Sequence, residues 1–296
     1  MTTTSSAKFR EMLQTNRLLS LPGVYDGITA RLSEQRGFKA VYMTGAGTSM
    51  SFGLPDFGLL TMTEMAGRAG AIAQSVGIPL IADADTGYGN ELNVTRTIRE
   101  YERGGVAGLH IEDQVSPKRC GHLDGKEIVS REDFLSKIRA ASAARRDKDF
   151  LIIARTDARA VAGFEEAVQR ANGALAAGAD MAFVEATQSL EEMAAVPKLV
   201  NGPCLLNIVR GGKTPDVDLR QIEEMGYRVA ILPGLLLGAA VEACDRALAA
   251  LLESNAPPTS VGVSLVRDRF RRFGGDEWDA LRTRFRQSEE PKAAAR

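Results

Sequence analysis

Three acidic side chains in the first half of the chain could together bind a divalent cation. Asp83 and Asp85 lie two positions apart, so on an extended strand both point the same way. Glu112 follows the next expected strand. Magnesium takes one or two carboxylates directly and keeps water or substrate oxygens in its other positions. We expect a magnesium site, open to manganese, with Asp85 as direct ligand and the other two acids acting through water. The alternative is that these acids only cap the helices that follow.

A cysteine flanked by basic residues offers a second kind of chemistry. Lys118, Arg119 and His122 surround Cys120 in the stretch Lys118-Arg-Cys-Gly-His122. Neighbouring positive charges lower the pKa of a thiol and make it a proton donor or a nucleophile. The same charges would attract an anionic substrate, and the glycines and the proline nearby suit a mobile lid. An exposed basic loop with an incidental cysteine is the alternative.

The remaining cysteines and one histidine are expected to be structural. Cys204 opens an apolar stretch, and Cys244 lies among alanines and a valine in a helical pattern, so both predict core packing. His110 lies between apolar residues and fits a core histidine. The 3 cysteines are too widely spaced for a disulfide framework or a zinc site, and they favour a reducing, cytoplasmic location.

These side chains must be positioned by short apolar runs that alternate with amphipathic helical stretches. Most of the runs are continuously apolar, as expected for parallel strands covered on both faces. Eight successive strand–helix units favour a closed (β/α)8 barrel of the TIM type over an open sheet. The expected strands are Leu18–Pro22, Ala40–Met43, Leu80–Ala82, Gly108–Ile111, Phe150–Ala154, Met181–Val184, Cys204–Ile208 and Arg228–Leu232.

Polar residues follow several of these strands, where barrel enzymes have their active sites. An acid or its partner at the ends of strands three to six predicts one polar site on one rim, although solvated loop residues are the alternative. Thr44-Gly-Ala-Gly47 lacks the third glycine of a dinucleotide fingerprint, so we expect its amides to hold a substrate carboxylate. The strand ends are Asp83-Ala-Asp85, Glu112-Asp113, Arg155-Thr-Asp157, Glu185 and Asn207.

The helical patterns divide the chain into a barrel and an extension. Beyond Asn255 the strand–helix rhythm stops, and two further amphipathic helices are expected before a frayed end at Glu289–Arg296. We therefore predict a catalytic barrel over residues 1–258 and a helical extension over residues 259–296. The expected helices include Leu92–Arg103, Arg131–Arg146, Phe164–Ala177, Gly234–Leu252, Val261–Phe273 and Asp276–Arg286.

The bulk composition excludes several classes of protein. With 296 residues, 44% hydrophobic and 25% charged, the chain can build a core without disulfides. Its net charge of −1 argues against electrostatic binding to nucleic acid or to an anionic membrane. No apolar stretch is long enough to cross a bilayer, and the N-terminus lacks the apolar segment of a secretory signal. We expect a cytoplasmic protein acting on a small molecule.

The stretch around Cys120 resembles that of isocitrate lyase and 2-methylisocitrate lyase, in the isocitrate lyase/phosphoenolpyruvate mutase superfamily. The resemblance runs from about Phe9 to Arg286 and implies a magnesium-dependent (β/α)8 barrel. It also implies homotetramers in which the C-terminal helices swap between neighbouring subunits. Its further motifs are Tyr42-Met-Thr-Gly-Ala-Gly47, Gly53-Leu-Pro-Asp56, Asp83-Ala-Asp-Thr-Gly-Tyr-Gly89, His110-Ile-Glu-Asp-Gln114 and Ile153-Ala-Arg-Thr-Asp157.

The resemblance implies a reaction as well. A 2-alkylmalate-type di- or tricarboxylate, similar to 2-methylisocitrate or 2,3-dimethylmalate, would be cleaved to an α-keto acid such as pyruvate and a carboxylate such as succinate. Cys120 would protonate the carbon released by cleavage, tuned by Lys118, Arg119 and His122. Either Tyr42 or an acid near the metal would remove the hydroxyl proton.

The implied site also covers the metal and the substrate. Asp85 would bind magnesium, supported by Asp83 and Glu112, and the metal would act with Arg155 on the developing oxyanion. The substrate would be held by Tyr42, Thr44, Gly45, Ala46, Asp56, Gly121, His122, Arg155, Glu185 and Asn207.

Some residues depart from the pattern and leave the substrate open. Thr44, Arg210 and Leu232-Pro-Gly differ from the methylisocitrate enzymes on strands two, seven and eight. The nearest rival function is hydrolysis or decarboxylation of oxaloacetate on the same scaffold. A phosphonate-forming mutase is disfavoured because such enzymes lack the loop cysteine. A non-catalytic barrel is disfavoured because Cys120 and the aspartates are all kept.

Overall fold

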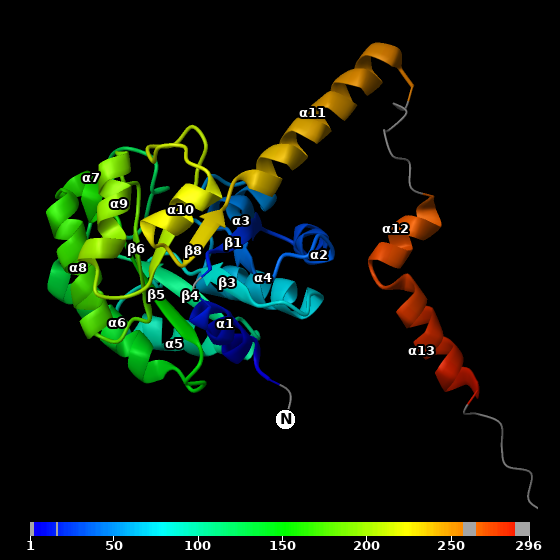
Figure 1. Ribbon diagram of the computed structural model, residues 1–296. Helices are drawn as coiled ribbons and strands as arrows, with labels where there is room; N and C mark the ends of the chain where they lie inside the picture. The colour runs from blue at the N-terminus through cyan, green and yellow to red at the C-terminus, as the bar shows by residue number, and fades with distance from the viewer. Residues whose placement is uncertain (1–2, 16, 257–264, 288–296) are drawn as a thin grey trace, which may run out of the picture. The chain divides into compact units, whose positions relative to one another are not determined.

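Figure 1 shows the computed structural model of the chain, which describes residues 3–15, 17–256 and 265–287. The chain divides into two compact units between Ala240 and Val241, inside one helix. The expected domain boundary at residues 258 and 259, the start of the helix expected from Val261 and the end at Glu289–Arg296 lie outside the described residues. Division of the chain at that boundary stays a prediction.

The first unit is built around parallel strands that close into a barrel in the order β1 to β8 (Figure 1). The closure is made by β1 and β8, which pair in parallel with Leu19 opposite Val229. The predicted (β/α)8 fold is thus confirmed, with each strand close to its expected position. The strands are β1 Leu19–Val24, β2 Val41–Met43, β3 Leu80–Asp83, β4 Gly108–Glu112, β5 Leu151–Thr156, β6 Met181–Val184, β7 Cys204–Asn207 and β8 Val229–Leu232.

One difference in strand length bears on the site. β5 continues two residues beyond its expected end, because Thr156 pairs with Val184 of β6. Arg155 therefore lies inside the strand, opposite Glu112 of β4. Its backbone is held on both sides by ladder hydrogen bonds, so the guanidinium projects from a rigid element rather than from a loop.

Helices follow the strands, and several begin at side-chain caps. Ser130 accepts a hydrogen bond from the Asp133 amide at the start of α6, and Thr61 and Glu64 form a capping box at the start of α4. The helices are α1 Ser5–Gln14, α2 Gly27–Gln35, α3 Gly45–Ser51, α4 Met62–Ser75, α5 Glu91–Arg103, α6 Arg131–Ala144, α7 Ala158–Val161, α8 Phe164–Ala176, α9 Leu190–Leu199, α10 Leu219–Met225, α11 Leu235–Ser254, α12 Val266–Arg272 and α13 Gly275–Gln287.

Apolar side chains fill the barrel interior toward the amino ends of the strands. Leu151 and Val229, near the starts of β5 and β8, belong to this cluster together with Ile81 and Phe183. Phe9 of α1 lies in the same cluster and is fully buried. The first helix thus packs on the amino-terminal end of the barrel, which leaves polar side chains to occupy the carboxyl-terminal end.

The second unit contains the rest of α11 together with α12 and α13. The two helices expected after the barrel are confirmed over their described residues. Arg271 of α12 donates to Asp276 of α13 at 2.8 Å. Cys244 is exposed in the single chain, so its expected core packing is wrong, whereas Cys204 is buried as expected. None of the described helices is long and apolar enough to cross a membrane.

The barrel closure predicts a steric test. In Gly23→Ala the new Cβ of β1 would lie 2.5 Å from the Cα of Pro233, which follows β8. Such overpacking against backbone should destabilise the fold by about 1–3 kcal/mol. Urea unfolding measures this loss. Gly67→Ala is the control, because its Cβ meets nothing within 4 Å on α4 and should be neutral or stabilising. Equal stability of both variants would contradict the packing described for the closure.

Candidate active site

A small polar pocket lies at the carboxyl-terminal end of the barrel. Its cavity volume is about 120 Å³, and most of the substrate-binding residues predicted from the sequence line it. Gly45 instead donates its amide to Asp83, and Lys118, Asp85 and Glu112 lie around the pocket rather than on its wall. The lining residues are Tyr42, Thr44, Ala46, Asp56, Asp83, Cys120, Gly121, His122, Arg155, Glu185, Asn207, Val209, Pro233, Gly234 and Leu237.

The glycine-rich segment after β2 is the start of a helix rather than a free turn. Thr44 is the N-cap of α3 and accepts a hydrogen bond from the Gly47 amide at 3.3 Å. The Gly45 amide donates to the Asp83 carboxylate, which already occupies the space that a Cβ at Gly45 would fill. The amide at Gly45 is thereby used within the protein. Thr44 and Ala46 remain on the pocket wall.

The turn after β3 holds its two aspartates by local hydrogen bonds. Asp83 accepts from the Asp85 amide at 2.9 Å, and Asp85 has a positive φ of 44° that a non-glycine residue rarely adopts. Asp85 therefore turns toward Lys118, whose ammonium lies 3.0 Å from its Oδ1 and 2.5 Å from Asp56 Oδ1. Lys118 is buried between these two acids, so its positive charge neutralises their carboxylates.

Arg155 joins the acids of three neighbouring strands. Its guanidinium lies 3.1 Å from Glu112 of β4 and 3.5 Å from Glu185 at the end of β6. Asp157, two residues further along the chain, accepts from its Nε at 3.0 Å. All of these side chains are buried. Buried charges are tolerated only when they are paired, so this cluster fixes the orientation of the guanidinium.

The acids beside the pocket fit a hard divalent cation. Glu112 Oε1 is buried without a hydrogen-bond partner, whereas Asp85 Oδ1 and Glu112 Oε2 lie 3.0 Å from the Lys118 ammonium and 3.1 Å from the Arg155 guanidinium. Burial raises the pKa of Glu112 well above its usual value and that of Asp85 to about 6. A bound cation would favour the charged form of both acids. Among the described residues, no group of three or more acidic, histidine or cysteine side chains is arranged to hold a metal ion by itself.

The thiol of Cys120 does not have the lowered pKa that the basic loop predicts. Burial, with Asp56 and Glu185 nearby, raises the pKa of Cys120 above its usual value near 9. Arg119 is exposed and stacks over Phe57, 5.8 Å from the ring centre, so it is outside the pocket. The expected lowering of the thiol pKa is therefore wrong, whereas catalytic roles for Lys118, Arg119 and His122 stay a prediction. A protonated thiol instead suits a proton donor better than a nucleophile.

His122 is a neutral side chain with a defined tautomer. Burial lowers the pKa of His122. The Lys213 amide donates to its Nδ1 at 3.1 Å, so the neutral ring carries its proton on Nε2. This Nε2 faces Glu185 at 3.4 Å, and Asn207 donates to the same carboxylate at 3.2 Å. His122, Glu185 and Asn207 thus form one wall of the pocket, as the sequence predicts.

Tyr42 lies on the opposite side and contacts the histidine that was expected to be structural. Its hydroxyl lies 2.9 Å from His110 Nε2 and 3.4 Å from Asp83. His110 is fully buried, and burial lowers its pKa to about 4. It is a core histidine as expected, but it also orients a pocket residue. Burial and the charge of Asp83 raise the pKa of Tyr42 well above its usual value, so its hydroxyl stays protonated.

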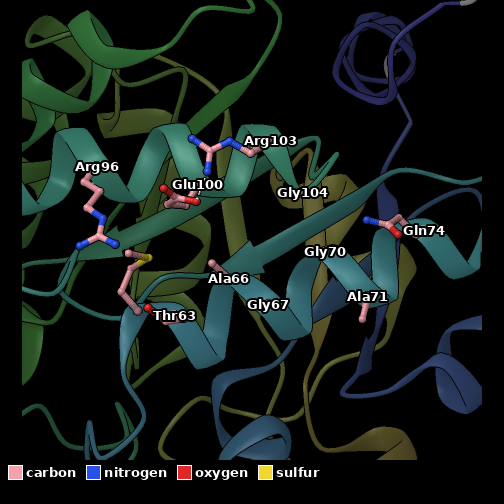
Figure 2. Close-up of a pocket in the computed structure, with 11 residues that line it drawn as sticks. Thr63, Ala66, Gly67, Gly70, Ala71, Gln74, Arg96, Glu100, Arg103 and Gly104 are labelled. Atoms are coloured by element: carbon pink, nitrogen blue, oxygen red, sulfur yellow. Dashed lines mark hydrogen bonds and ion pairs between the residues drawn. The ribbon is translucent and has the colours of Figure 1, made fainter.

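A larger hollow of about 490 Å³ lies outside the barrel, between α4 and α5 (Figure 2). Small residues of α4 such as Gly67 and Gly70 form one side, and Arg96, Glu100 and Arg103 of α5 form the other. Glu100 and Arg103 pair with each other at 2.5 Å. This groove contains no described cysteine, histidine or acid cluster, so the smaller polar pocket is the candidate active site.

The sequence profile of the phosphoenolpyruvate phosphomutase family matches residues 9–252. The chain belongs to the phosphoenolpyruvate mutase/isocitrate lyase superfamily. It is 50% identical over 230 residues to 2,3-dimethylmalate lyase of Eubacterium barkeri, covering 77% of this chain and 80% of the relative. It is 46% identical to 2-methylisocitrate lyase of Aeropyrum pernix, covering 82% and 79%. These lyases confirm the expected enzyme class, a carbon–carbon lyase.

Solved structures of the superfamily show the same fold. A 2,3-dimethylmalate lyase matches with a TM-score of 0.92 at 39% identity, covering 100% of both chains. An oxaloacetate acetylhydrolase with the inhibitor 3,3-difluorooxalacetate matches with a TM-score of 0.91 at 40% identity, covering 97% of this chain and 98% of that one. A phosphonopyruvate hydrolase in complex with oxalate and Mg²⁺ matches at 0.86 and 31% identity, covering 95% and 99%.

Sequence reasoning missed two parts of the site in this superfamily member. Lys126, in the loop after β4, is buried against Asp157, but a single lysine among charged loop residues gives no signal of burial. Val209, Pro233 and Leu237 form an apolar wall. The stretch from Leu232 was noted as a departure that bears on the substrate, but the apolar wall itself was not predicted, because apolar residues just beyond a strand end resemble ordinary core. Only the closed barrel shows that they face the polar side chains.

The raised pKa of Cys120 predicts slow thiol chemistry at neutral pH. Alkylation by iodoacetamide requires the thiolate, which forms as the pH rises through the thiol pKa. The alkylation rate of Cys120, followed by mass spectrometry of its peptide, should therefore keep rising above pH 9. The exposed Cys244 is the internal reference for an accessible thiol. A plateau in the Cys120 rate near neutral pH would show a lowered pKa instead.

Proposed function

We propose that this carbon–carbon lyase cleaves a 2-alkylmalate-type carboxylate, with Cys120 as proton donor. The observation that supports the proposal is the partly buried, protonated thiol in the same pocket as Arg155 and a neutral His122. Cleavage leaves a carbanion that must be protonated, and a thiol with a raised pKa still holds its proton at neutral pH. The chain's similarity to 2,3-dimethylmalate lyase and 2-methylisocitrate lyase agrees with this chemistry.

The proposal includes a magnesium ion, with manganese as a substitute. Asp85 would hold it directly, with Asp83 and Glu112 acting through water. The buried Glu112 Oε1, which has no hydrogen-bond partner, supports this assignment together with the acids beside it, and a phosphonopyruvate hydrolase of the superfamily was solved with Mg²⁺. When bound, the ion supplies Lewis-acid stabilisation of negative charge on substrate oxygens.

The bond changes assign a task to each protein group. Removal of the C2 hydroxyl proton lets that oxygen form a carbonyl while the C2–C3 bond breaks. The bonding electron pair stays on C3 and spreads into its neighbouring carboxylate. Cys120 gives its proton to C3, which completes the carboxylate product, and the thiolate then regains a proton from solvent. Arg155 would stabilise the negative oxygen at C2.

The base that accepts the hydroxyl proton is better sought among the acids than at Tyr42. Because its pKa is raised, the Tyr42 hydroxyl is suited to donating a hydrogen bond to the keto-acid half. Asp85, Asp83 and Glu112 remain candidates for the base. Thr44 and Ala46 would hold the same half of the substrate, and Asn207 would contact the far carboxylate.

The apolar wall bears on the substrate class. Val209, Pro233 and Leu237 would accommodate alkyl groups on the substrate. Arg155 is the one cationic side chain on the described pocket lining, and three acids already surround it. A third substrate carboxylate would find little positive charge there. The pocket therefore favours a 2,3-dimethylmalate-like dicarboxylate over a tricarboxylate such as 2-methylisocitrate.

Oxaloacetate hydrolysis or decarboxylation is the second candidate. The similarity to an oxaloacetate acetylhydrolase of TM-score 0.91 supports it, because the two activities share one scaffold.

The proposal further includes a cytoplasmic homotetramer with exchanged C-terminal helices, as the resemblance implies. Exposed apolar residues such as Phe270 and Trp278 support burial of this segment in an assembly, and light scattering would measure the mass.

A substrate panel tests the proposed reaction. With magnesium present, pyruvate release should be fastest from 2,3-dimethylmalate, because its methyl groups meet the apolar wall and it needs no third cationic contact. The panel also holds 2-methylisocitrate, isocitrate, citramalate and oxaloacetate, with glyoxylate measured for isocitrate and oxalate for oxaloacetate. A chelator should abolish turnover, and added magnesium should restore it. Turnover of oxaloacetate alone would transfer the assignment to the hydrolase or decarboxylase.

The thiol is tested by Cys120→Ala. Loss of the proton donor should lower kcat by about 100- to 10,000-fold. Thermal unfolding should change little, because Cys120 is only partly buried. Cys244→Ser is the matched control and should keep full activity, since Cys244 lies outside the barrel unit. Cleavage by Cys120→Ala at the wild-type rate would rule out the thiol as proton donor.

A further inference from the structure

The loop that carries Cys120 leaves the barrel after β4 and returns to its own starting point. Gln114 and Ile128 form an antiparallel bridge at its base. The Val115 amide donates to the Glu127 carbonyl at 2.9 Å, on the loop side of that bridge. Paired backbone makes this base a fixed stem. Beyond it, the Gln114 side chain binds the Arg119 carbonyl at 2.8 Å and the Arg119 amide at 3.0 Å, and side-chain contacts with the barrel rim position the rest of residues 116–126.

Lys126 stands beside this stem and reaches into the loop. Its ammonium donates to the carbonyl of Gly121, the residue after Cys120, and to Asp157 Oδ1 at 2.8 Å. The Lys126 side chain is 1% exposed and that of Asp157 is fully buried. Lysine is rarely buried this completely unless it is paired. The amine thus joins three points: the stem, the peptide next to the thiol and the end of β5.

The backbone held by Lys126 lies directly on the catalytic cluster. A Cβ at Gly121 would overlap Glu185 and Arg155. The loop therefore packs its bare backbone on the Arg155 guanidinium. Asp157 accepts from both Lys126 and Arg155. One carboxylate thereby ties the position of the loop to the orientation of Arg155.

We propose that Lys126 is a positioning residue that latches the Cys120 loop onto the Asp157–Arg155 cluster. Its two donated hydrogen bonds hold the Gly121 peptide down, so that the adjoining thiol faces the pocket. Lys126 does not line the pocket itself and would not touch the substrate. The inference rests on the proposed function only for the role of the thiol, because the latch can be measured without any substrate.

The test is the accessibility of Cys120 in Lys126→Met, made in a Cys244→Ser background so that the exposed thiol does not compete. Iodoacetamide labelling is followed by mass spectrometry of the Cys120 and Cys204 peptides. Loss of two buried charge-assisted hydrogen bonds should open the loop and raise the Cys120 rate about tenfold or more. Cys204, 1% exposed in β7, should stay unlabelled.

A matched lysine gives the control. Lys213 also pairs with this loop, but its partner Asp124 is 93% exposed, and such surface pairs contribute little. Lys213→Met keeps the backbone amide that binds His122, and it should leave the Cys120 labelling rate unchanged. A rise of similar size in both variants would overturn the proposal, because any loss of loop charge would then suffice.

Further outcomes separate a latch from a general loss of stability. An unchanged Cys120 rate in Lys126→Met, or a parallel rise at Cys204, would overturn the proposal. Lys126→Gln keeps one donor and should give an intermediate rate. If both variants fail to fold, Lys126 is needed for the barrel itself and the positioning role is wrong. With a substrate that the wild-type enzyme cleaves, Lys126→Met should lower kcat more than it raises KM, because the thiol is misplaced while the substrate contacts remain.

Discussion

The buried guanidinium of Arg155 is the interaction on which the site depends. Acids from three successive strand ends, Glu112, Asp157 and Glu185, surround it, and buried charges of this kind are tolerated only when they are paired. The barrel makes the arrangement feasible, because neighbouring parallel strands bring their carboxyl ends to one rim. The cost of burying these charges is offset only while the geometry holds, so the fold and the site stabilise each other.

Burial also sets the protonation states that the chemistry needs. The same withdrawal from water that raises the pKa of Cys120 and Tyr42 lowers that of His122. The pocket therefore holds a protonated thiol, a protonated phenol and a neutral imidazole. Each of these groups can donate a hydrogen bond or a proton without adding charge. Burial likewise raises the pKa of Asp85 and Glu112, so a divalent cation beside them would favour the charged form of both acids.

The loop after β4 completes the site from above, by contacts that reach across the barrel rim. Lys118 binds the acids after β2 and β3, whereas Lys126 binds the acid after β5. The two lysines are close in sequence, but they are anchored on opposite sides of the thiol between them. The two buried lysines of this loop thus bind the loop to acidic side chains at the strand ends. Arg119, which has no such acid beside it, points outward over Phe57.

The sequence by itself determined the barrel fold and which polar residues lie at the carboxyl ends of its strands. Continuous apolar runs between amphipathic helices leave few alternatives to a closed parallel sheet, and Asp83, Glu112, Arg155, Glu185 and Asn207 fall at strand ends by position alone. Only the tertiary structure decided which charges face each other. A pKa depends on burial and on partners distant in sequence, so a basic stretch could not reveal that Cys120 keeps its proton. The burial of Lys126 and the apolar wall at Val209 are likewise set by the barrel's closure, because closure places segments far apart in the chain within a few ångströms of one another.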